Sequence, residues 1–208
     1  MSVPSPYIVS SKGLVFSSGT IEVVGEAANP GATPICYAQI AVRFYDTADQ
    51  LVAVDDGSTY LTATRLGERN PFKTILFDAP KTIDHYRTSL SWSQCFGEYR
   101  SLTVLSQQVR NNNGPEVFGE IRNDHDVTMS GVDVALTFYD AAGAVAYTDW
   151  DLPSPSTLAP GGRAIYSMPT FVRNLTYARY TVPTPATPCG RRGACRLLAL
   201  SIPTLAAR

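Results

Sequence analysis

The chain contains an internal repeat. When the 208-residue sequence is shifted by 94 residues, its first half aligns with its second half without a gap, and 18 of 81 aligned positions are identical. The longest identical block is Phe44-Tyr45-Asp46 on Phe138-Tyr139-Asp140. Self-similarity at a fixed period indicates a duplicated folding unit. The sequence therefore predicts two homologous domains.

The composition between the repeats suggests where one domain ends. The run Asn111-Asn112-Asn113-Gly114-Pro115 interrupts the pattern as a turn or hinge does, so the border is expected near residues 107–114. The predicted organisation is an N-terminal extension over residues 1–12, a first domain over 13–106 and a second over 107–208.

Each repeat reads as a series of short strands. Ala38, Ile40, Val42 and Phe44 alternate with more polar residues, which is typical of a half-buried strand. Further strands are expected over residues 20–27, 51–54, 72–77, 86–92 and 102–105, and over 145–148 in the second copy. About seven short strands per hundred residues favour an immunoglobulin-like sandwich. We therefore predict an all-β protein of two immunoglobulin-like or fibronectin-like antiparallel β-sandwich domains in series.

Short motifs follow one another in the same order in both copies. They are residues 23–26, Asn29, 42–46, Gly67 and Phe72 in the first copy, and residues 117–120, Asn123, 136–140, 158–161 and Tyr166 in the second. This order resembles the FxLYD domain, although the Phe and Leu of that motif are replaced. The resemblance implies a bacterial or archaeal extracytoplasmic β-sandwich without established catalytic activity, often repeated or attached to envelope anchors.

Four cysteines allow three pairings, which sequence alone does not settle. Cys95 and Cys189 are equivalent in the repeat, whereas Cys36 aligns with Ser130. Bridges within each domain, Cys36 with Cys95 and Cys189 with Cys195, are the most economical solution. The alternative is four reduced thiols in a cytosolic protein.

Composition limits the partners. The net charge is −1 and basic residues are scattered, which argues against nucleic acid as a partner. No apolar run reaches the roughly 18 residues of a membrane span. The N-terminus lacks the charged start and apolar core of a signal peptide. Either the protein is cytosolic, or it is a mature chain with a start Met added. The resemblance and the cysteines favour export to the cell surface, periplasm or medium.

The ionisable residues give little indication of catalysis. Neither His85 nor His125 accompanies a nucleophile motif. Residues 124–126 (Asp-His-Asp) could be a metal site, but a solvated turn is the better interpretation. The repeated Asp46 and Asp140 are expected to accept backbone hydrogen bonds in turns. We predict no enzyme activity, no cofactor and no metal.

Trp150 is the most suggestive aromatic residue, because Asp149 and Asp151 flank it and favour water. The predicted function is a non-catalytic spacer or interaction module that contacts another envelope or extracellular protein, or a second copy of itself. The alternative is a carbohydrate-binding module in which Trp150, Tyr147 and Tyr60 share one surface. A third interpretation is a hydrolase at the domain junction, with Glu or His of shifted pKa in a deep cleft.

Overall fold

The computed structural model describes residues 4–95, 97–111, 113–170 and 172–189. The described residues form strands and turns, and they contain no helix that could span a membrane. The strands of the first half are β1 (Tyr7–Val15), β2 (Ile21–Ala28), β3 (Ile35–Tyr45), β4 (Leu51–Ser58), β5 (Ala63–Thr64), β6 (Arg69–Leu76) and β7 (His85–Gln94). The strands of the second half are β8 (Arg100–Ser101), β9 (Thr103–Asn111), β10 (Pro115–Arg122), β11 (Met129–Ser130), β12 (Val134–Tyr139), β13 (Val145–Asp151), β14 (Arg163–Pro169), β15 (Arg179–Thr181) and β16 (Pro185–Pro188).

Both halves are antiparallel sandwiches. In the first, the sheet β1-β2-β6 faces the sheet formed by β4, β3 and β7, with β5 paired to one end of β3. In the second, β14-β10-β9 faces β13-β12-β15, and the short strands β11-β16-β8 form a further sheet. The predicted fold class, an all-β protein of two tandem immunoglobulin-like sandwiches, is confirmed.

The strands repeat with the period found in the sequence. Shifted by 94 residues, β2 falls on β10 residue for residue, and β4 and β6 begin where β13 and β14 begin. The buried amides Asn29 and Asn123 occupy one such pair of positions. Each donates two hydrogen bonds to backbone carbonyls, of Thr33 and Thr64 in the first copy and of Val127 and Leu158 in the second. The duplication therefore preserves a buried polar contact as well as the strands.

The repeated Asp residues cap turns as predicted. One carboxylate oxygen of Asp46 accepts the N–H groups of Ala48 and Gln50, each at 2.9 Å. Asp140 accepts those of Ala142 and Ala144 at the same distances. The two carboxylates thus fix the turns between β3 and β4 and between β12 and β13.

The structure differs from the expected position of the domain border. Residues 100–111 pair with strands of the second half, β8 with β16 and β9 with β10. Residues 107–111 are consequently the end of β9, which pairs directly with β10 from Pro115 onwards, so the expected border falls within one sandwich. The chain passes from one sandwich to the other between β7 and β8.

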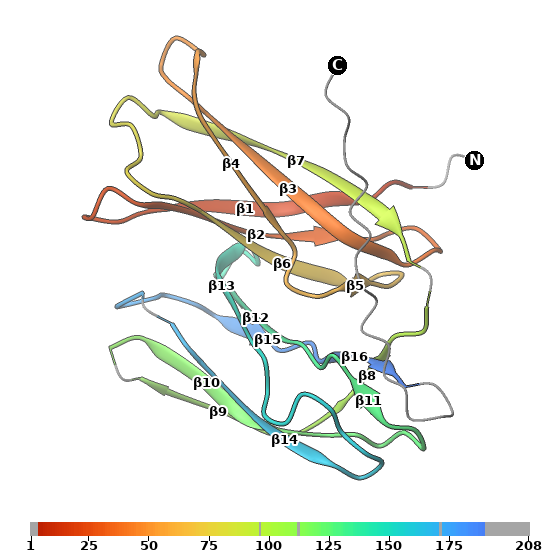
Figure 1. Ribbon diagram of the computed structural model, residues 1–208. Coiled ribbons are helices and arrows are strands. Elements are labelled where there is room, and N and C mark those ends of the chain that lie inside the picture. Colours follow the sequence, from red (N-terminus) through yellow and green to blue (C-terminus); the bar gives the residue numbers. More distant parts are fainter. Residues whose placement is uncertain (1–3, 96, 112, 171, 190–208) are drawn as a thin grey trace.

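The two sandwiches, which follow one another along the chain, stack face to face rather than end to end. Figure 1 shows four layers, from β4-β3-β7 through β1-β2-β6 and β13-β12-β15 to β9-β10-β14. Strand β13 contacts β1, β2 and β6 across the junction. Val24 of β2 packs into the core of the second sandwich, although its neighbour Val23 belongs to the core of the first. The sheet β1-β2-β6 is therefore covered on both faces.

Candidate functional site at the domain junction

Strands β2 and β12 are the central strands of the two sheets that meet at the junction, and both are largely buried. Strand β12 is buried along its whole length, which a half-buried strand of an isolated sandwich would not be. Val134, Leu136 and Phe138 fill its own core, whereas Ala135 and Tyr139 alternate with them and point towards the first sandwich. Burial on both faces explains why this strand carries no long charged side chain.

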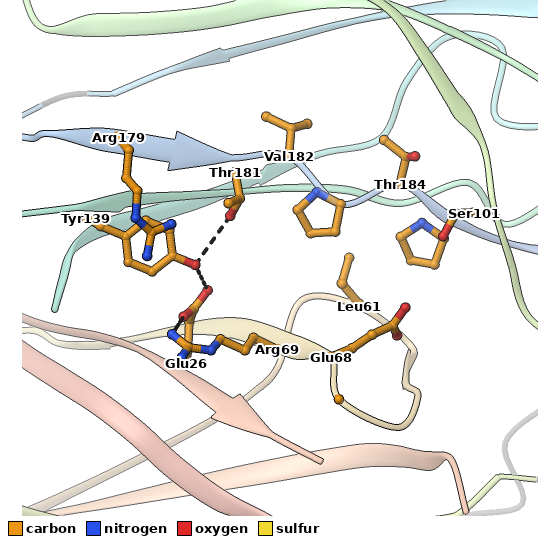
Figure 2. Close-up of a pocket in the computed structure, with 13 residues that line it drawn as sticks. Glu26, Leu61, Glu68, Arg69, Ser101, Tyr139, Arg179, Thr181, Val182 and Thr184 are labelled. Atoms are coloured by element: carbon orange, nitrogen blue, oxygen red, sulfur yellow. Dashed lines mark hydrogen bonds and ion pairs between the residues drawn. The ribbon is translucent and has the colours of Figure 1, made fainter. Parts of the chain in front are cut away.

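A buried carboxylate joins the two sandwiches. Tyr139 Oη donates a hydrogen bond to Glu26 Oε1 at 2.6 Å, and Arg69 Nη1 lies 3.4 Å from Glu26 Oε2. Glu26 is only 1% exposed. The guanidinium of Arg179 lies over the Tyr139 ring, 3.7 Å from its centroid. Burial, and then the hydrogen bond to the Glu26 carboxylate, raise the pKa of Tyr139. Figure 2 shows this network at one end of a groove between the domains.

The groove at the junction has a volume of about 460 Å³ and is open to solvent. Leu61, Glu68 and Arg69 line it from the first sandwich, and Ser101 and the segment 181–185 line it from the second. Among the described residues that line it there is no His, and Ser101 Oγ accepts a hydrogen bond from Arg65 at 2.7 Å. The groove thus contains Glu residues, as the hydrolase interpretation expects, but no nucleophile paired with a base.

A second polar cluster lies elsewhere in the junction. Lys73 Nζ of β6 is 3.7 Å from Asp149 Oδ1 and 3.3 Å from Tyr147 Oη, both on β13. Burial raises the pKa of Asp149, and Lys73 opposes that shift. Burial likewise raises the pKa of Glu22, again against Lys73. Thr148 Oγ1 donates to the backbone oxygen of Phe72 at 2.9 Å. The interface therefore combines apolar packing with specific polar contacts.

The predicted aromatic surface is not present as expected. Trp150 is 45% exposed, and its ring lies 6.1 Å from that of Tyr60. Tyr147, however, is 1% exposed. The expectation that Tyr147 shares an exposed surface with Trp150 is therefore wrong, because Tyr147 is buried at the junction beside Lys73. Tyr60 is half-buried and its hydroxyl oxygen is enclosed, so it does not extend a flat exposed platform beside Trp150, and burial raises its pKa.

One of the two predicted disulfides is confirmed. Cys36 of β3 and Cys95, just after β7, are bonded, with Cα atoms 5.1 Å apart. Cys36 is 3% exposed, so the bond lies against the core of the first sandwich. The second predicted pair, Cys189 with Cys195, includes a residue outside the described part of the chain, and it stays a prediction.

The residues of the suspected metal turn point to different partners. Asp124 pairs with Arg122, His125 Nε2 is 2.9 Å from the backbone oxygen of Ser101, and Asp126 lies 3.8 Å from Arg100. Within the part of the chain that the structure describes, no three His, Cys, Asp or Glu side chains are grouped as metal ligands. The turn is held by these separate contacts.

His85 lies at the other end of the molecule. Its ring stacks on Tyr45, with centroids 5.4 Å apart, and its nitrogens are 3.1 Å from Asp49 and from Asp84. Arg87 also covers the Tyr45 ring, at 4.5 Å from its centroid. These side chains lie on the outer sheet face of the first sandwich.

Among the described residues, no strand packs on the outer faces of the β4-β3-β7 and β9-β10-β14 sheets, and the sequence interpretation missed both faces as candidate sites. The β4-β3-β7 face presents Leu51 and Val54, each 53% exposed. The β9-β10-β14 face presents Phe118 and Ile165, the latter 68% exposed. The first of these faces could have been found from the alternation in β3, because the residues between its core positions must point outwards.

Some solved structures match this chain, and the similarity of the match described below is low. No family model matches the chain, and no curated protein matches it. A solved structure of red sea bream transglutaminase matches at a TM-score of 0.28 with 12% sequence identity. The match covers 88% of this chain and 31% of that one, so the chain spans about a third of the length of the transglutaminase. A likeness at this level carries no argument about function.

Proposed function

We propose that the protein is a non-catalytic protein-interaction module of the cell envelope or extracellular space, related to FxLYD domains. The observation that carries this proposal is the face-to-face stacking of the two sandwiches. The stacking engages Glu26, Lys73 and Asp149 within the junction, and it leaves two outer sheet faces that no described strand covers. The chain is then a compact block that presents surfaces, rather than an end-to-end spacer.

The disulfide supports the extracytoplasmic part of the proposal. The disulfide joins Cys36 of β3, which is buried, to Cys95 after β7, which is half-buried. Such a bond is compatible with an oxidising compartment, where disulfides form and persist. A thiol count on native, unreduced protein tests this part. Reduced Cys36 and Cys95 in freshly isolated protein would contradict it.

The interaction itself is tested by site-specific photo-crosslinking. A photoreactive amino acid replaces Val54 on one free face or Ile165 on the other, and the labelled protein is applied to intact cells of its own source. We expect discrete protein adducts at one or both positions. The matched control is Leu66, which is 62% exposed but lies in the turn before β6, away from both faces. Equal labelling at Leu66, or no protein adduct at either face, would contradict the proposal.

The carbohydrate-binding alternative has less geometric support. It requires several aromatic faces on one exposed surface, and of its three expected residues Tyr147 is buried and Tyr60 is half-buried. Trp150 alone presents a partly exposed ring. Quenching of tryptophan fluorescence by soluble glycans, abolished in Trp150→Ala, would reverse this preference.

A further inference from the structure

The junction joins two faces that are not equivalent in the repeat. The outer face of β1-β2-β6 contacts the outer face of β13-β12-β15, which corresponds to β4-β3-β7 of the first copy. A contact between two different faces does not use up both copies of either face. It leaves one face of each kind without a sandwich against it, one at each end of the described stack. The free β4-β3-β7 and β9-β10-β14 faces are therefore the counterparts of the two faces already in contact.

The free β9-β10-β14 face repeats the carboxylate of the junction. Glu120 corresponds to Glu26, and Arg163 corresponds to Arg69. Arg163 Nη1 lies 3.3 Å from Glu120 Oε2, against 3.4 Å in the buried pair. Here, however, a third of the Glu120 side chain is exposed. In the described structure no tyrosine of a second sandwich covers Glu120, whereas Tyr139 covers its counterpart Glu26.

The free β4-β3-β7 face supplies that tyrosine. Tyr45 corresponds to Tyr139, and both rings lie under a guanidinium, that of Arg87 at 4.5 Å and that of Arg179 at 3.7 Å. The ring of Tyr45 is half-buried and stands at the edge of a free sheet face. One free face thus carries the hydrogen-bond donor of the junction, and the other carries its acceptor.

Apolar side chains and charge also match across the two free faces. Phe118 occupies the position in the second copy that corresponds to Val24, which packs across the junction. Ile165 is paired with Glu120 in the register of β10 and β14. Leu51 and Val54 present exposed aliphatic groups on the opposite face. Arg43, exposed between β4 and β7, brings a cation to the face that would meet the Glu120 carboxylate.

We propose that the β9-β10-β14 face of one copy docks on the β4-β3-β7 face of a second copy, continuing between molecules the stack of sandwiches that begins within the chain. The expected contact is weaker than the junction, because Val54 replaces Thr148 and cannot reproduce its hydrogen bond to a backbone oxygen. Association is therefore expected to be reversible and open-ended.

Sedimentation velocity of the full chain tests the proposal, from about 1 µM to about 500 µM, the range in which weak contacts are populated. The average mass is expected to rise with concentration and to pass that of a dimer. Ile165→Asp and Val54→Asp each alter one free face and are expected to weaken association at least tenfold. Leu51→Asp provides a second variant of the Val54 face, and Leu66→Asp is the control that associates like the wild type. Unchanged melting temperatures establish that the variants are folded.

Mixing the two variants gives the decisive result. Ile165→Asp keeps an intact β4-β3-β7 face, and Val54→Asp keeps an intact β9-β10-β14 face. An equimolar mixture is therefore expected to form a one-to-one heterodimer and nothing larger. A wild type that stays monomeric, a wild type that stops at a dimer, or a mixture that stays monomeric would overturn the proposal.

This inference rests on the proposed function, but the two can fail separately. A monomeric wild type that still gives protein adducts at Val54 or Ile165 on cells would exclude a second copy as the partner and retain the interaction module. Absence of adducts at both positions, with a monomeric wild type, would contradict both proposals.

Discussion

The hydrogen bond between Tyr139 and Glu26 offers the sharpest test of the stacked arrangement. Its two atoms are 2.6 Å apart, both side chains are at most 3% exposed, and they belong to different sandwiches. Tyr139→Phe removes one oxygen and little volume, so packing is conserved. The Glu26 carboxylate then loses a buried donor and retains only Arg69, at 3.4 Å and half in water.

The expected loss of unfolding free energy is about 1.5–3 kcal/mol, the usual range for a hydrogen bond to a charged group. For a chain of this size the loss corresponds to a melting temperature lower by roughly 3–12 °C. Urea unfolding and calorimetry measure the two quantities. The matched control is Tyr45→Phe, the same substitution at the equivalent position of the free face, which is expected to change stability by less than about 0.5 kcal/mol in dilute monomeric protein.

A double-mutant cycle assigns the effect to the pair. Tyr139→Phe and Glu26→Gln, alone and together, are expected to show a coupling energy of about 0.5–3 kcal/mol, as residues in direct contact do. Additive losses, or a loss in Tyr45→Phe equal to that in Tyr139→Phe, would refute the reasoning that this contact holds the two sandwiches together.

Three further predictions concern the junction, the disulfide and the buried amides. Because burial raises the pKa of Glu22 in the folded protein, its contribution to stability is present below the unfolded pKa of about 4.3 and is lost as pH rises through the folded pKa. Glu22→Gln is therefore expected to stabilise the protein by less than about 1 kcal/mol at pH 7 and to have no effect at pH 4, as measured by urea unfolding; a larger effect at pH 4 would reverse the assignment. Replacing Cys36 and Cys95 together by Ala opens a loop with a sequence separation of 59 and is expected to lower the unfolding free energy by about 2–4 kcal/mol, with reduction of the wild type by a thiol as the comparison. Asn29→Ala and Asn123→Ala each remove two hydrogen bonds to backbone carbonyls, and calorimetry is expected to show losses of about 2–4 kcal/mol in both, whereas a neutral result at either would contradict the shared structural role.

Local chemistry made part of the fold predictable from the sequence. The alternation of Ile40, Val42 and Phe44 identifies an inner face because side chains on a strand point alternately to its two sides. The caps at Asp46 and Asp140 follow from the ability of a short carboxylate to accept nearby N–H groups. The bridge between Cys36 and Cys95 follows from keeping each bond within one repeat.

The domain border was misplaced because two kinds of turn share one chemistry. The run that begins at Asn111 has the composition of a flexible hinge, but the same residue types also form tight turns, and here Asn111 ends β9 and Pro115 begins β10. The repeat indicates the position of the domain border more accurately. It places residues 101–109 opposite β1, the first strand of the first sandwich, and it aligns Val109 with Val15. A period is thus stronger evidence for a border than turn composition.

The stacking of the sandwiches is indicated by positions at which the sequences of the two copies differ, rather than by positions at which they are identical. Arg43 and Thr137 occupy the same outward position, yet Arg43 is exposed and Thr137 is fully buried. Burial of an unpaired guanidinium is costly, so only the copy with the smaller residue can be covered there. Glu26 and Glu120 show the opposite case, because the same residue type occupies both positions. Glu26 is buried where Tyr139 of the other sandwich packs against it. Differences at outward positions therefore indicate which face is covered, whereas the surroundings of a repeated charge depend on what packs against it.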